Sequence, residues 1–381
     1  MPFFPRFLTG MLLEKLRLNK ILIIYGARRI GKTTLCKQII QEYGHTAKFV
    51  NCESFVERQK LESQSIETII DSFKGYSMVI FDEAQTIDGI GKILKLIYDT
   101  LEFRNQKISI IATGSSSFEL NNQVGEPLVG RAFSYQMYPL SLCELTPHFS
   151  TSDLQDRQEN ILRYGLMPDV FGEGERDAEE KLYQLVSGYL YKDILAVEGV
   201  KKSSLVIAIL KALAFQVGST VSVREIAELV QSTPITVEKY IDILEKCFII
   251  FSLSSLARNP RNEIKKAKKY YFYDLGVRNA LIQNFNPLNA RNDVGALWEN
   301  FCILERMKLL QSRQIYHSQY FWRTTSQKEI DYIEEYNAKF YAFEFKWNPK
   351  KEAKIPPDFS SFYTNYDYNI VNSENWLTHL T

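Results

Sequence analysis

The sequence predicts an α/β protein whose N-terminal domain is built on a parallel β-sheet. Two short apolar runs, Ile21 to Tyr25 and Met78 to Phe81, are typical of buried parallel strands. The first run leads into a glycine-bounded loop and then into a segment with apolar residues at helical spacing, and the second ends in two carboxylates. The 381 residues are enough for two or three domains with separate cores.

Composition excludes several classes of protein. Hydrophobic residues make up 45% of the chain and charged residues 24%, which is ordinary for a globular protein. The net charge of +1 argues against a chain that coats nucleic acid by bulk electrostatics, although a local basic patch stays open. The five cysteines form no C-x-x-C pair, which favours reduced thiols in the cytoplasm and no zinc site. No long apolar run or signal-peptide pattern occurs, so we expect no membrane contact.

The loop after the first strand matches the pattern G-x-x-x-x-G-K-[ST] without interruption. Gly26 and Gly31 can take backbone angles closed to other residues, which lets successive N–H groups turn towards an anion. The N-terminus of the following helix adds a partial positive charge. Lys32 would reach the β- and γ-phosphates of ATP, and the Thr33 hydroxyl would ligate Mg²⁺. The predicted nucleotide-binding residues are Gly26, Ala27, Arg28, Arg29, Ile30, Gly31, Lys32, Thr33 and Thr34.

The second strand ends at Asp82 and Glu83, the arrangement of a Walker B motif. A buried parallel strand delivers its last residues to the carboxyl edge of the sheet, where ligands of open α/β sheets bind. Asp82 would hold Mg²⁺ opposite Thr33, and Glu83 would polarise the water that attacks the γ-phosphate. An isolated Asp-Glu pair after an apolar run is more often a strand that ends at a solvated turn. The upstream loop favours the catalytic interpretation.

Two further catalytic candidates follow later in this domain. Lys107 to Thr113 is a third apolar strand. In nucleoside triphosphatases with a strand inserted between the two Walker strands, a polar residue at the tip of that strand touches the γ-phosphate or the attacking water. Ser115 is the first candidate for this role and Thr113 the second, with a serine-rich helix cap as the alternative. Arg131 is a candidate arginine finger, in cis or towards a neighbouring subunit, with a surface salt bridge as the alternative.

Together, the runs GARRIGKTTL, VIFDEAQ, IIATGSSSFEL and LVGRAFSYQMYPLSLCEL resemble the AAA-type ATPases whose C-terminal half is the DUF4143 domain. Later segments match the same family, namely Tyr164 to Pro168, Tyr189 to Ile194 and Lys269 to Leu275. The first of these departs from the family at Leu166, where a second glycine is usual. The resemblance covers nearly the whole chain and implies binding of Mg²⁺ and ATP, with hydrolysis.

The region from Val221 to Leu253 has the pattern of a winged helix-turn-helix, with two helices separated by a Ser-Thr-Pro turn. A helix that contacts DNA needs an electropositive outer face, but the exposed positions of the second helix carry a net charge of minus one. A basic run from Lys265 to Lys269 could contact the backbone phosphates of DNA, and a solvated loop explains it equally well. A role in protein interaction or scaffolding is therefore favoured over DNA binding. The charged positions of the second helix are Glu238, Lys239, Asp242, Glu245 and Lys246.

The last third of the chain resembles the PD-(D/E)XK nuclease core. Glu299 on a predicted helix, Asp331 on a strand, and Glu344 with Lys346 on the next strand occur in the order of that core. Alternation along a strand places Glu344 and Lys346 on one face. The three acids would ligate Mg²⁺ while Lys346 positions water or stabilises developing charge. The alternative is a vestigial site, in which the fold serves as a scaffold and Glu344 and Lys346 form an ordinary ion pair.

We therefore expect a P-loop NTPase domain with an AAA-like parallel sheet over residues 1–150, a helical linker and winged-helix domain over 151–285, and a nuclease-like α/β domain over 286–381. The expected function is Mg-dependent binding and slow hydrolysis of ATP that drives a molecular switch. An ATP-regulated nuclease and a nucleotide-gated module for DNA or protein are the alternatives. Beyond ATP, the expected partner is a protein or a second copy that contacts the ATPase domain.

Overall fold

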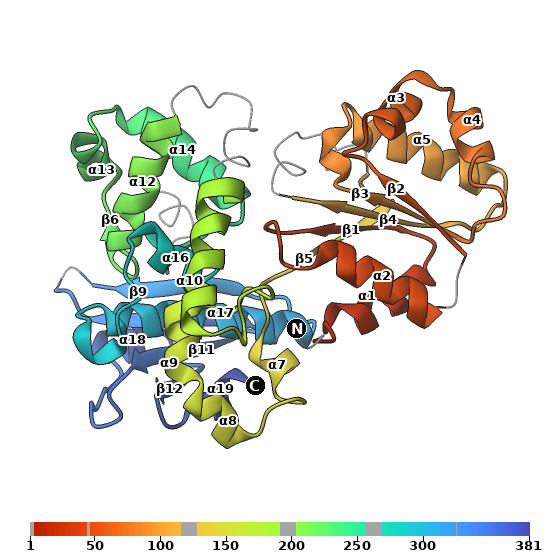
Figure 1. The fold of residues 1–381 in the computed structure, drawn as a ribbon. Coiled ribbons are helices and arrows are strands. Elements are labelled where there is room, and N and C mark those ends of the chain that lie inside the picture. Colours follow the sequence, from red (N-terminus) through yellow and green to blue (C-terminus); the bar gives the residue numbers. More distant parts are fainter. Residues whose placement is uncertain (1–3, 44–45, 116–127, 191–202, 257–267, 325) are drawn as a thin grey trace.

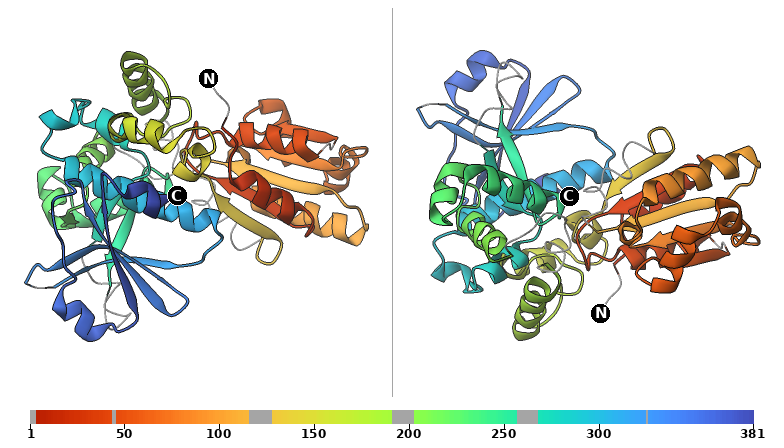
Figure 2. Two further views of the ribbon diagram at one scale, coloured as in Figure 1. Left: turned by 90° about the horizontal axis from the view of Figure 1, so that it is seen from below. Right: turned by 90° about the horizontal axis from the view of Figure 1, so that it is seen from above.

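The computed structural model describes residues 4–43, 46–115, 128–190, 203–256, 268–324 and 326–381. These residues form two lobes that lie side by side (Figures 1 and 2). The N-terminal lobe extends to Gln136, and the remaining residues form the second lobe. One cluster of buried apolar side chains continues from the first lobe into the second, so the lobes are packed against each other. No helix in the described ranges combines the length and apolar character needed to cross a membrane.

The N-terminal lobe is built on a five-stranded sheet in which every neighbouring pair is parallel. Its strands are β1 (Ile21–Tyr25), β2 (Ala47–Asn51), β3 (Met78–Asp82), β4 (Ser109–Gly114) and β5 (Ala132–Gln136). The order β2-β3-β4-β1-β5 places β4 between β1 and β3. The predicted P-loop NTPase sheet is thereby confirmed, and the carboxyl ends of β1, β3 and β4 meet at one edge.

Helices cover both faces of this sheet (Figure 1). Alternation along β1 sends Leu22 and Ile24 to one core and Ile21 and Ile23 to the other. The first face is covered by α1 and α2, and the second by α3, α4 and α5. The bounds are α1 (Leu8–Leu16), α2 (Lys32–Tyr43), α3 (Phe55–Ser63), α4 (Ile66–Asp71) and α5 (Ile90–Phe103), with a 3₁₀ turn at Ala84–Thr86.

The second lobe begins with short helices, in the region where the sequence predicted a helical linker. Leu154, Ile161 and Leu162 of these helices are buried in the core that both lobes share. The helices are α7 (Leu142–Leu145), α8 (Thr151–Asp156), α9 (Gln158–Tyr164) and α10 (Glu175–Gln184), followed by a π-helical segment, Leu185–Leu190.

Two helices stand where the two helices of the helix-turn-helix were predicted, and a third precedes them. The Thr233 side chain accepts a hydrogen bond from the Thr236 N–H, and Pro234 opens the helix that follows, since proline fits the first turn. Val237 and Ile241 are buried, whereas Glu238, Lys239 and Asp242 face solvent. The helices are α12 (Ser203–Phe215), α13 (Val223–Leu229) and α14 (Pro234–Lys246).

A seven-stranded sheet in the order β12-β11-β10-β9-β7-β8-β6 joins the predicted middle and C-terminal domains. A parallel pair between β7 and β9 makes the connection. Strands from both sides of the predicted domain boundary at residue 285 therefore belong to one sheet. The strands are β6 (Thr220–Val221), β7 (Ile250–Ser255), β8 (Lys268–Phe272), β9 (Ser318–Arg323), β10 (Glu329–Tyr336), β11 (Lys339–Lys346) and β12 (Tyr366–Asn372).

The remaining helices enclose this second sheet. The long helix α17 packs against β11 and against α19, and the buried Phe359 of α18 belongs to a separate apolar cluster with Trp322 and Ile330. The bounds are α16 (Leu275–Leu281), α17 (Val294–Ser312), α18 (Pro357–Phe362) and α19 (Trp376–Leu380), with a 3₁₀ turn at Leu288–Ala290.

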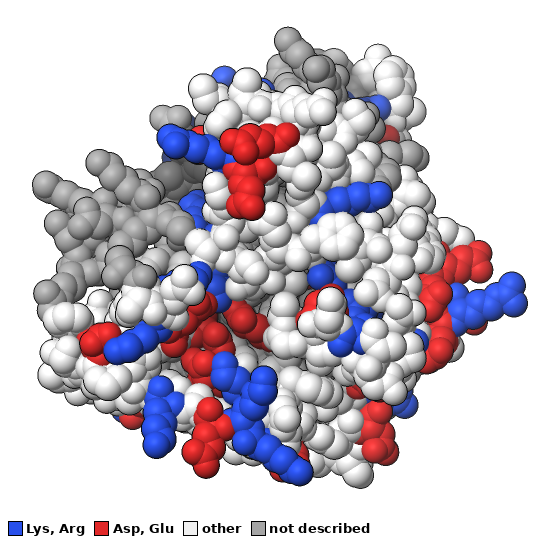
Figure 3. Space-filling view, turned by 90° about the vertical axis from the view of Figure 1, so that its left-hand side faces the viewer, with Lys and Arg blue, Asp and Glu red and all other residues white. Residues whose placement is uncertain are grey.

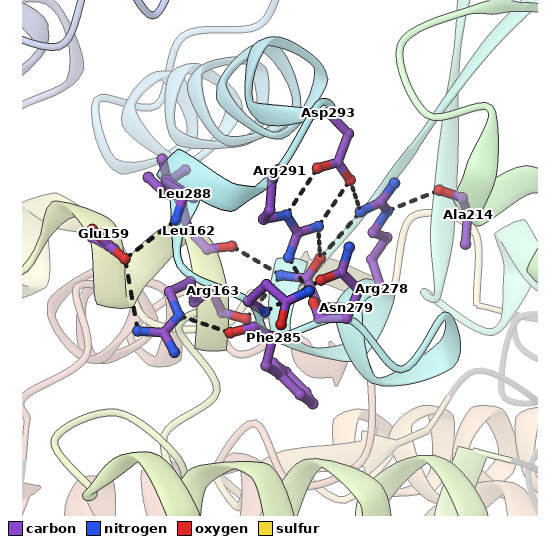
Figure 4. A network of polar contacts seen from close by, with 12 residues as sticks. Glu159, Leu162, Arg163, Ala214, Arg278, Asn279, Phe285, Leu288, Arg291 and Asp293 are labelled. Carbon is purple, nitrogen blue, oxygen red and sulfur yellow. Dashed lines mark hydrogen bonds and ion pairs between the residues drawn. The ribbon is translucent and has the colours of Figure 1, made fainter.

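A buried polar network ties α9, α12, α16 and the start of α17 together (Figure 4). Arg278 Nη1 lies 2.5 Å from Asp293 Oδ2, and Arg291 Nε lies 2.8 Å from Asp293 Oδ1. Arg278 Nε donates to the Ala214 carbonyl of α12 at 2.8 Å, and the Asn279 amide donates to two carbonyls of α9. One carboxylate thus forms ion pairs with two arginines of the second lobe.

Candidate nucleotide site

The loop between β1 and α2 depends on glycine for two different reasons. Gly26 has a φ of 150°, and a Cβ placed there would lie 2.3 Å from the Met137 carbonyl oxygen. At Gly31 a Cβ would make only ordinary van der Waals contacts, but the φ of 93° is one that side chains disfavour. Arg29 adopts a φ of 63° between them. The loop is therefore a tight turn held against the segment that follows β5.

Lys32 lies inside the curve of this loop, with only 3% of its side chain exposed. Its Nζ donates to the carbonyls of Gly26 at 2.9 Å and Ala27 at 3.1 Å. The same atom lies 3.6 Å from Glu83 Oε1. The ammonium group predicted to contact phosphates therefore stands between the loop and the carboxylate at the end of β3.

Thr33 in the first turn of α2 and Asp82 at the end of β3 are in contact. Thr33 Oγ1 donates a hydrogen bond to Asp82 Oδ2 at 2.9 Å, and Thr113 Oγ1 donates to Asp82 Oδ1 at 2.5 Å. A hydroxyl and a carboxylate in contact are hard oxygen donors of the type that Mg²⁺ prefers. The residues present at this position therefore fit a magnesium ion.

Glu83 follows β3 in a left-handed backbone conformation, with a φ of 53°. Its N–H donates to Thr113 Oγ1 at 3.1 Å, which fixes the turn. Burial alone would raise the pKa of the Glu83 carboxyl, but the Lys32 ammonium and the hydrogen bond from Gln85 lower it, and the net shift is downward. Glu83 is therefore ionised at neutral pH, as a general base must be.

Gln85 is a site residue that the sequence reasoning missed. Its Nε2 donates to Glu83 Oε2 at 2.6 Å and to Ser115 Oγ at 2.8 Å. Ser115, the first candidate at the tip of β4, thus contacts Gln85, whereas Thr113, the second candidate, contacts Asp82 and the Glu83 backbone. The available signal was the position of Gln85 two residues after Glu83, in the turn that closes the site.

The remaining predicted loop residues lie at the edge of the site, where two of them form ion pairs. Arg28 lies 3.8 Å from Glu53 after β2, and Arg29 lies 3.6 Å from Asp169 of the second lobe. Thr34 is exposed in the first turn of α2. Two cations and an exposed hydroxyl therefore border the loop.

A buried arginine connects the loop to the second lobe. Arg6 Nη1 donates to the Ile30 carbonyl at 2.6 Å, and Arg6 Nε donates to Glu144 Oε1 of α7 at 2.9 Å. The backbone N–H of Leu142, also in α7, donates to Glu305 Oε2 of α17 at 2.8 Å. This hydrogen-bonded chain leads from the predicted phosphate loop to the longest helix of the second lobe.

Arg131 lies at the opposite end of the sheet from the loop. Strand β5 runs parallel to β1 with Ala132 beside Ile21, so Arg131 precedes the amino end of β1 while Gly26 follows its carboxyl end. The guanidinium forms two hydrogen bonds with Asp99 of α5, at 2.6 and 3.0 Å. An arginine finger acting in cis does not fit this position, and action towards a neighbouring subunit stays a prediction.

The residues of the nuclease-like core come together in the second lobe. Glu299 lies on α17, Asp331 on β10, and Glu344 with Lys346 on β11. Lys346 Nζ is 2.5 Å from Glu344 Oε1 and 3.9 Å from Asp331 Oδ2. Within the described ranges, no group of three or more His, Cys, Asp or Glu side chains has an arrangement that would hold a metal ion.

The predicted basic run near the helix-turn-helix lies only partly within the described residues, because positions 265–267 are outside them. Lys269 cannot contact DNA phosphates, since it is 2% exposed and forms ion pairs with Glu299 and Glu329. Figure 3 shows one face of the second lobe, on which the described basic and acidic side chains are interspersed. On this face the charge distribution differs from the continuous basic surface of proteins that bind DNA.

The sheet order, the loop after β1 and the carboxylates after β3 define the fold of a P-loop ATPase. A family model described as an AAA domain matches residues 18–146, and the model of DUF4143 matches residues 294–377. A third model, DUF8612, a domain of unknown function, matches residues 155–288 between them. The chain thus carries an AAA domain and a C-terminal DUF4143 domain, which confirms the resemblance seen in the sequence.

Relatives and a solved structure agree with this assignment. An uncharacterized protein of Haemophilus influenzae is 27% identical over 278 residues, which span 68% of each chain. An uncharacterized protein of Methanocaldococcus jannaschii is 25% identical over 305 residues, spanning 69% of this chain and 62% of the relative. A Walker-type ATPase of Pyrococcus abyssi has 16% sequence identity and a TM-score of 0.50, covering 74% of this chain and 96% of that chain. This last likeness supports the fold alone.

Proposed function

We propose that this protein binds ATP with Mg²⁺ and hydrolyses it slowly, as a nucleotide-driven switch. The observation that carries the proposal is the hydrogen bond of 2.9 Å between Thr33 and Asp82. It brings the two predicted magnesium ligands into contact although they are separated in the chain, Thr33 in the first turn of α2 and Asp82 at the end of β3. A chance glycine turn beside an unrelated strand end would have no reason to produce this contact.

Each side chain of the site has a separate task in this proposal. Lys32 would bind the β- and γ-phosphates, and Thr33 with Asp82 would hold Mg²⁺, which neutralises phosphate charge when bound. Glu83 would accept a proton from the attacking water, which its ionised carboxylate and its position beside Lys32 support. Thr113 would hold the Asp82 carboxylate, to which its hydroxyl donates, and the Glu83 backbone N–H, from which the hydroxyl accepts.

The switch part of the proposal is supported by contacts between the lobes next to the loop. Tyr25, the residue before Gly26, stacks on Phe248 at the end of α14 with ring centroids 5.3 Å apart. Phe248 has a φ of 50°, an uncommon conformation for a bulky residue. Together with the Arg6 connection, these contacts would transmit a change in the loop to α14 and α17. The task performed by the second lobe would then depend on the nucleotide.

The test is a steady-state phosphate-release assay on the wild type and Lys32→Ala, with and without nucleic acid. We expect Mg-dependent turnover in the wild type and no nucleotide binding in Lys32→Ala. Equal turnover in the two proteins, or turnover that is unchanged by a chelator, would refute the proposal. Size-exclusion chromatography with and without ATP tests the associated proposal that the ATPase domain contacts a partner or a second copy.

A further inference from the structure

A groove lies between the two lobes on the side where β5 ends the first sheet. It is lined by α1 and β5 of the first lobe, and by the last turns of α17 and the segment that follows them in the second lobe. The cavity has a volume of about 480 Å³, and most of its lining consists of aromatic rings and glutamine amides. Neither the nucleotide site nor the nuclease-like residues contribute to the lining, so the groove is distinct from both.

Strand β5 has one edge that no described strand covers, since among these strands it pairs with β1 alone. The Arg131 carbonyl accepts the Ile21 N–H at 2.9 Å, and the Met137 N–H donates to the Tyr25 carbonyl at 2.8 Å. Successive residues of a strand direct their N–H and C=O groups to alternate sides. Because Ser134 is three residues from both Arg131 and Met137, its backbone groups point away from β1. These groups form part of a template for another strand.

Gln136 shows that the outer edge of β5 accepts hydrogen bonds from outside its own sheet. Its C=O, which also points away from β1, accepts a bond from Gln311 Nε2 of α17 at 2.7 Å. Ser134 is exposed, and no described strand lies beside it on this edge. Phe133 and Tyr316, which are 37% and 97% exposed, line the same groove. An open strand edge beside exposed aromatic rings is suited to an extended peptide that adds a strand.

The charged side chains of the groove favour an acidic occupant. Lys15 and His317 belong to the lining, whereas no described aspartate or glutamate does, since the adjacent Glu14 of α1 lies outside it. Lys15 Nζ lies 5.9 Å from the centroid of the Phe133 ring, and within the described ranges it forms no ion pair. A cation that lacks a carboxylate partner complements a binding partner that supplies one.

We propose that this groove binds an extended acidic segment of a partner protein, which pairs with β5 as an added strand. The backbone groups of Ser134 would exchange hydrogen bonds with the segment, and Lys15 would face one of its carboxylates. The exposed rings of Phe133 and Tyr316 would cover its apolar side chains. The inference rests on the proposed contact between the ATPase domain and a partner, and it does not require ATP hydrolysis.

The first experiment pans a displayed library of random heptapeptides, without nucleotide, on the wild type, Ser134→Pro and Ser134→Ala. Proline removes the outward N–H and is tolerated on an edge strand, whereas alanine keeps that N–H and is the matched control. We expect the wild type and Ser134→Ala to enrich the same peptides, rich in aspartate and glutamate, and Ser134→Pro to enrich none of them. No enrichment, enrichment without an acidic preference, or equal enrichment on Ser134→Pro would overturn the proposal. Because ATP is absent, failure of this test leaves the proposed hydrolysis untouched.

The second experiment measures the affinity of one enriched peptide by fluorescence anisotropy, on Lys15→Glu and on Lys92→Glu. The control changes an exposed lysine of α5, on the opposite face of the sheet from α1. We expect binding to weaken about fivefold or more in Lys15→Glu and to stay unchanged in Lys92→Glu. Equal affinities in the two variants would contradict the proposal.

Sedimentation of the wild type and Ser134→Pro, without peptide, tests a different occupant of the groove. We expect both proteins to sediment alike, because the proposed occupant is a segment of another protein. A wild-type dimer that Ser134→Pro dissociates would overturn the proposal by assigning the groove to a second copy of this chain.

Discussion

The sharpest prediction for the nucleotide site concerns the carboxylate of Glu83. Replacing it with glutamine keeps the shape of the side chain and its hydrogen bond with Gln85 but removes the proton acceptor and the charge 3.6 Å from Lys32. General-base catalysis contributes about 100- to 10,000-fold in rate, which corresponds to roughly 3–5 kcal/mol of activation free energy. We expect Glu83→Gln to lose turnover by that factor.

Nucleotide affinity should respond in the opposite direction. Glu83 is a buried anion beside the position predicted for the γ-phosphate, so its removal relieves a like-charge repulsion. Glu83→Gln should therefore bind ATP as tightly as the wild type or more tightly, and retain it. Filter binding of labelled ATP and phosphate release under single-turnover conditions separate the two effects. Glu57→Gln, which changes a partly exposed acid paired with Lys60, is the control.

Turnover by Glu83→Gln within about threefold of the wild type would refute the base assignment, because general-base catalysis is worth at least about 100-fold. The comparison is meaningful in preparations where Lys32→Ala has no turnover, since that variant reports contaminating ATPases. A loss of both binding and turnover in Glu83→Gln would also contradict the reasoning, because it would assign to Glu83 a structural role at the loop.

Three further predictions concern other residues. Gln85→Leu removes the hydrogen bond from Gln85 to the Glu83 carboxylate, and a hydrogen bond to a charged group is worth roughly 1.5–3 kcal/mol. We therefore expect kcat to fall about tenfold or more while KM is retained. The acidic limb of the rate profile should also move to higher pH, because that bond lowers the pKa of Glu83. Arg6→Ala should lower the free energy of unfolding by about 3–5 kcal/mol in urea titrations, since it leaves the buried Glu144 without its partner. Burial alone would raise the pKa of the Asp293 carboxyl, but Arg291 and Arg278 lower it to about 2. The ion pair therefore stabilises the fold above about pH 4, and this stabilisation is lost as pH falls towards 2. Asp293→Asn should cost about 1–2 kcal/mol at neutral pH, allowing for solvent screening, and flatten the loss of stability in acid.

The N-terminal lobe could be predicted closely because its signals are local. The strand Ile21–Tyr25 has the predicted bounds, since a continuous apolar run with a glycine after it has few other solutions. Gly26 and Lys32 were identified by a pattern in which each position has a backbone or charge requirement. The contact between Thr33 and Asp82 followed from the rule that parallel strands present their carboxyl ends at one edge.

The second lobe resisted prediction because its determinants are distant in sequence. The pairing of β7 with β9 crosses the domain boundary predicted at residue 285, and no local pattern encodes a parallel pair between strands so far apart in the chain. Gln85 was overlooked for a related reason, because a neutral amide in a turn shows its role only when the strand carrying Ser115 lies beside it.

Lys269 shows how the same limitation changes a functional conclusion. In the sequence it is the end of a basic run and looks solvated, while Glu299, Asp331 and Glu344 have the order of metal ligands. The pairing of β8 with β7, and of β7 with β9, carries Lys269 to the first of those acids, Glu299, with which it forms an ion pair at 3.0 Å. The order of acidic residues in a sequence names candidate ligands, but only the pairing of the strands shows which cation lies beside them.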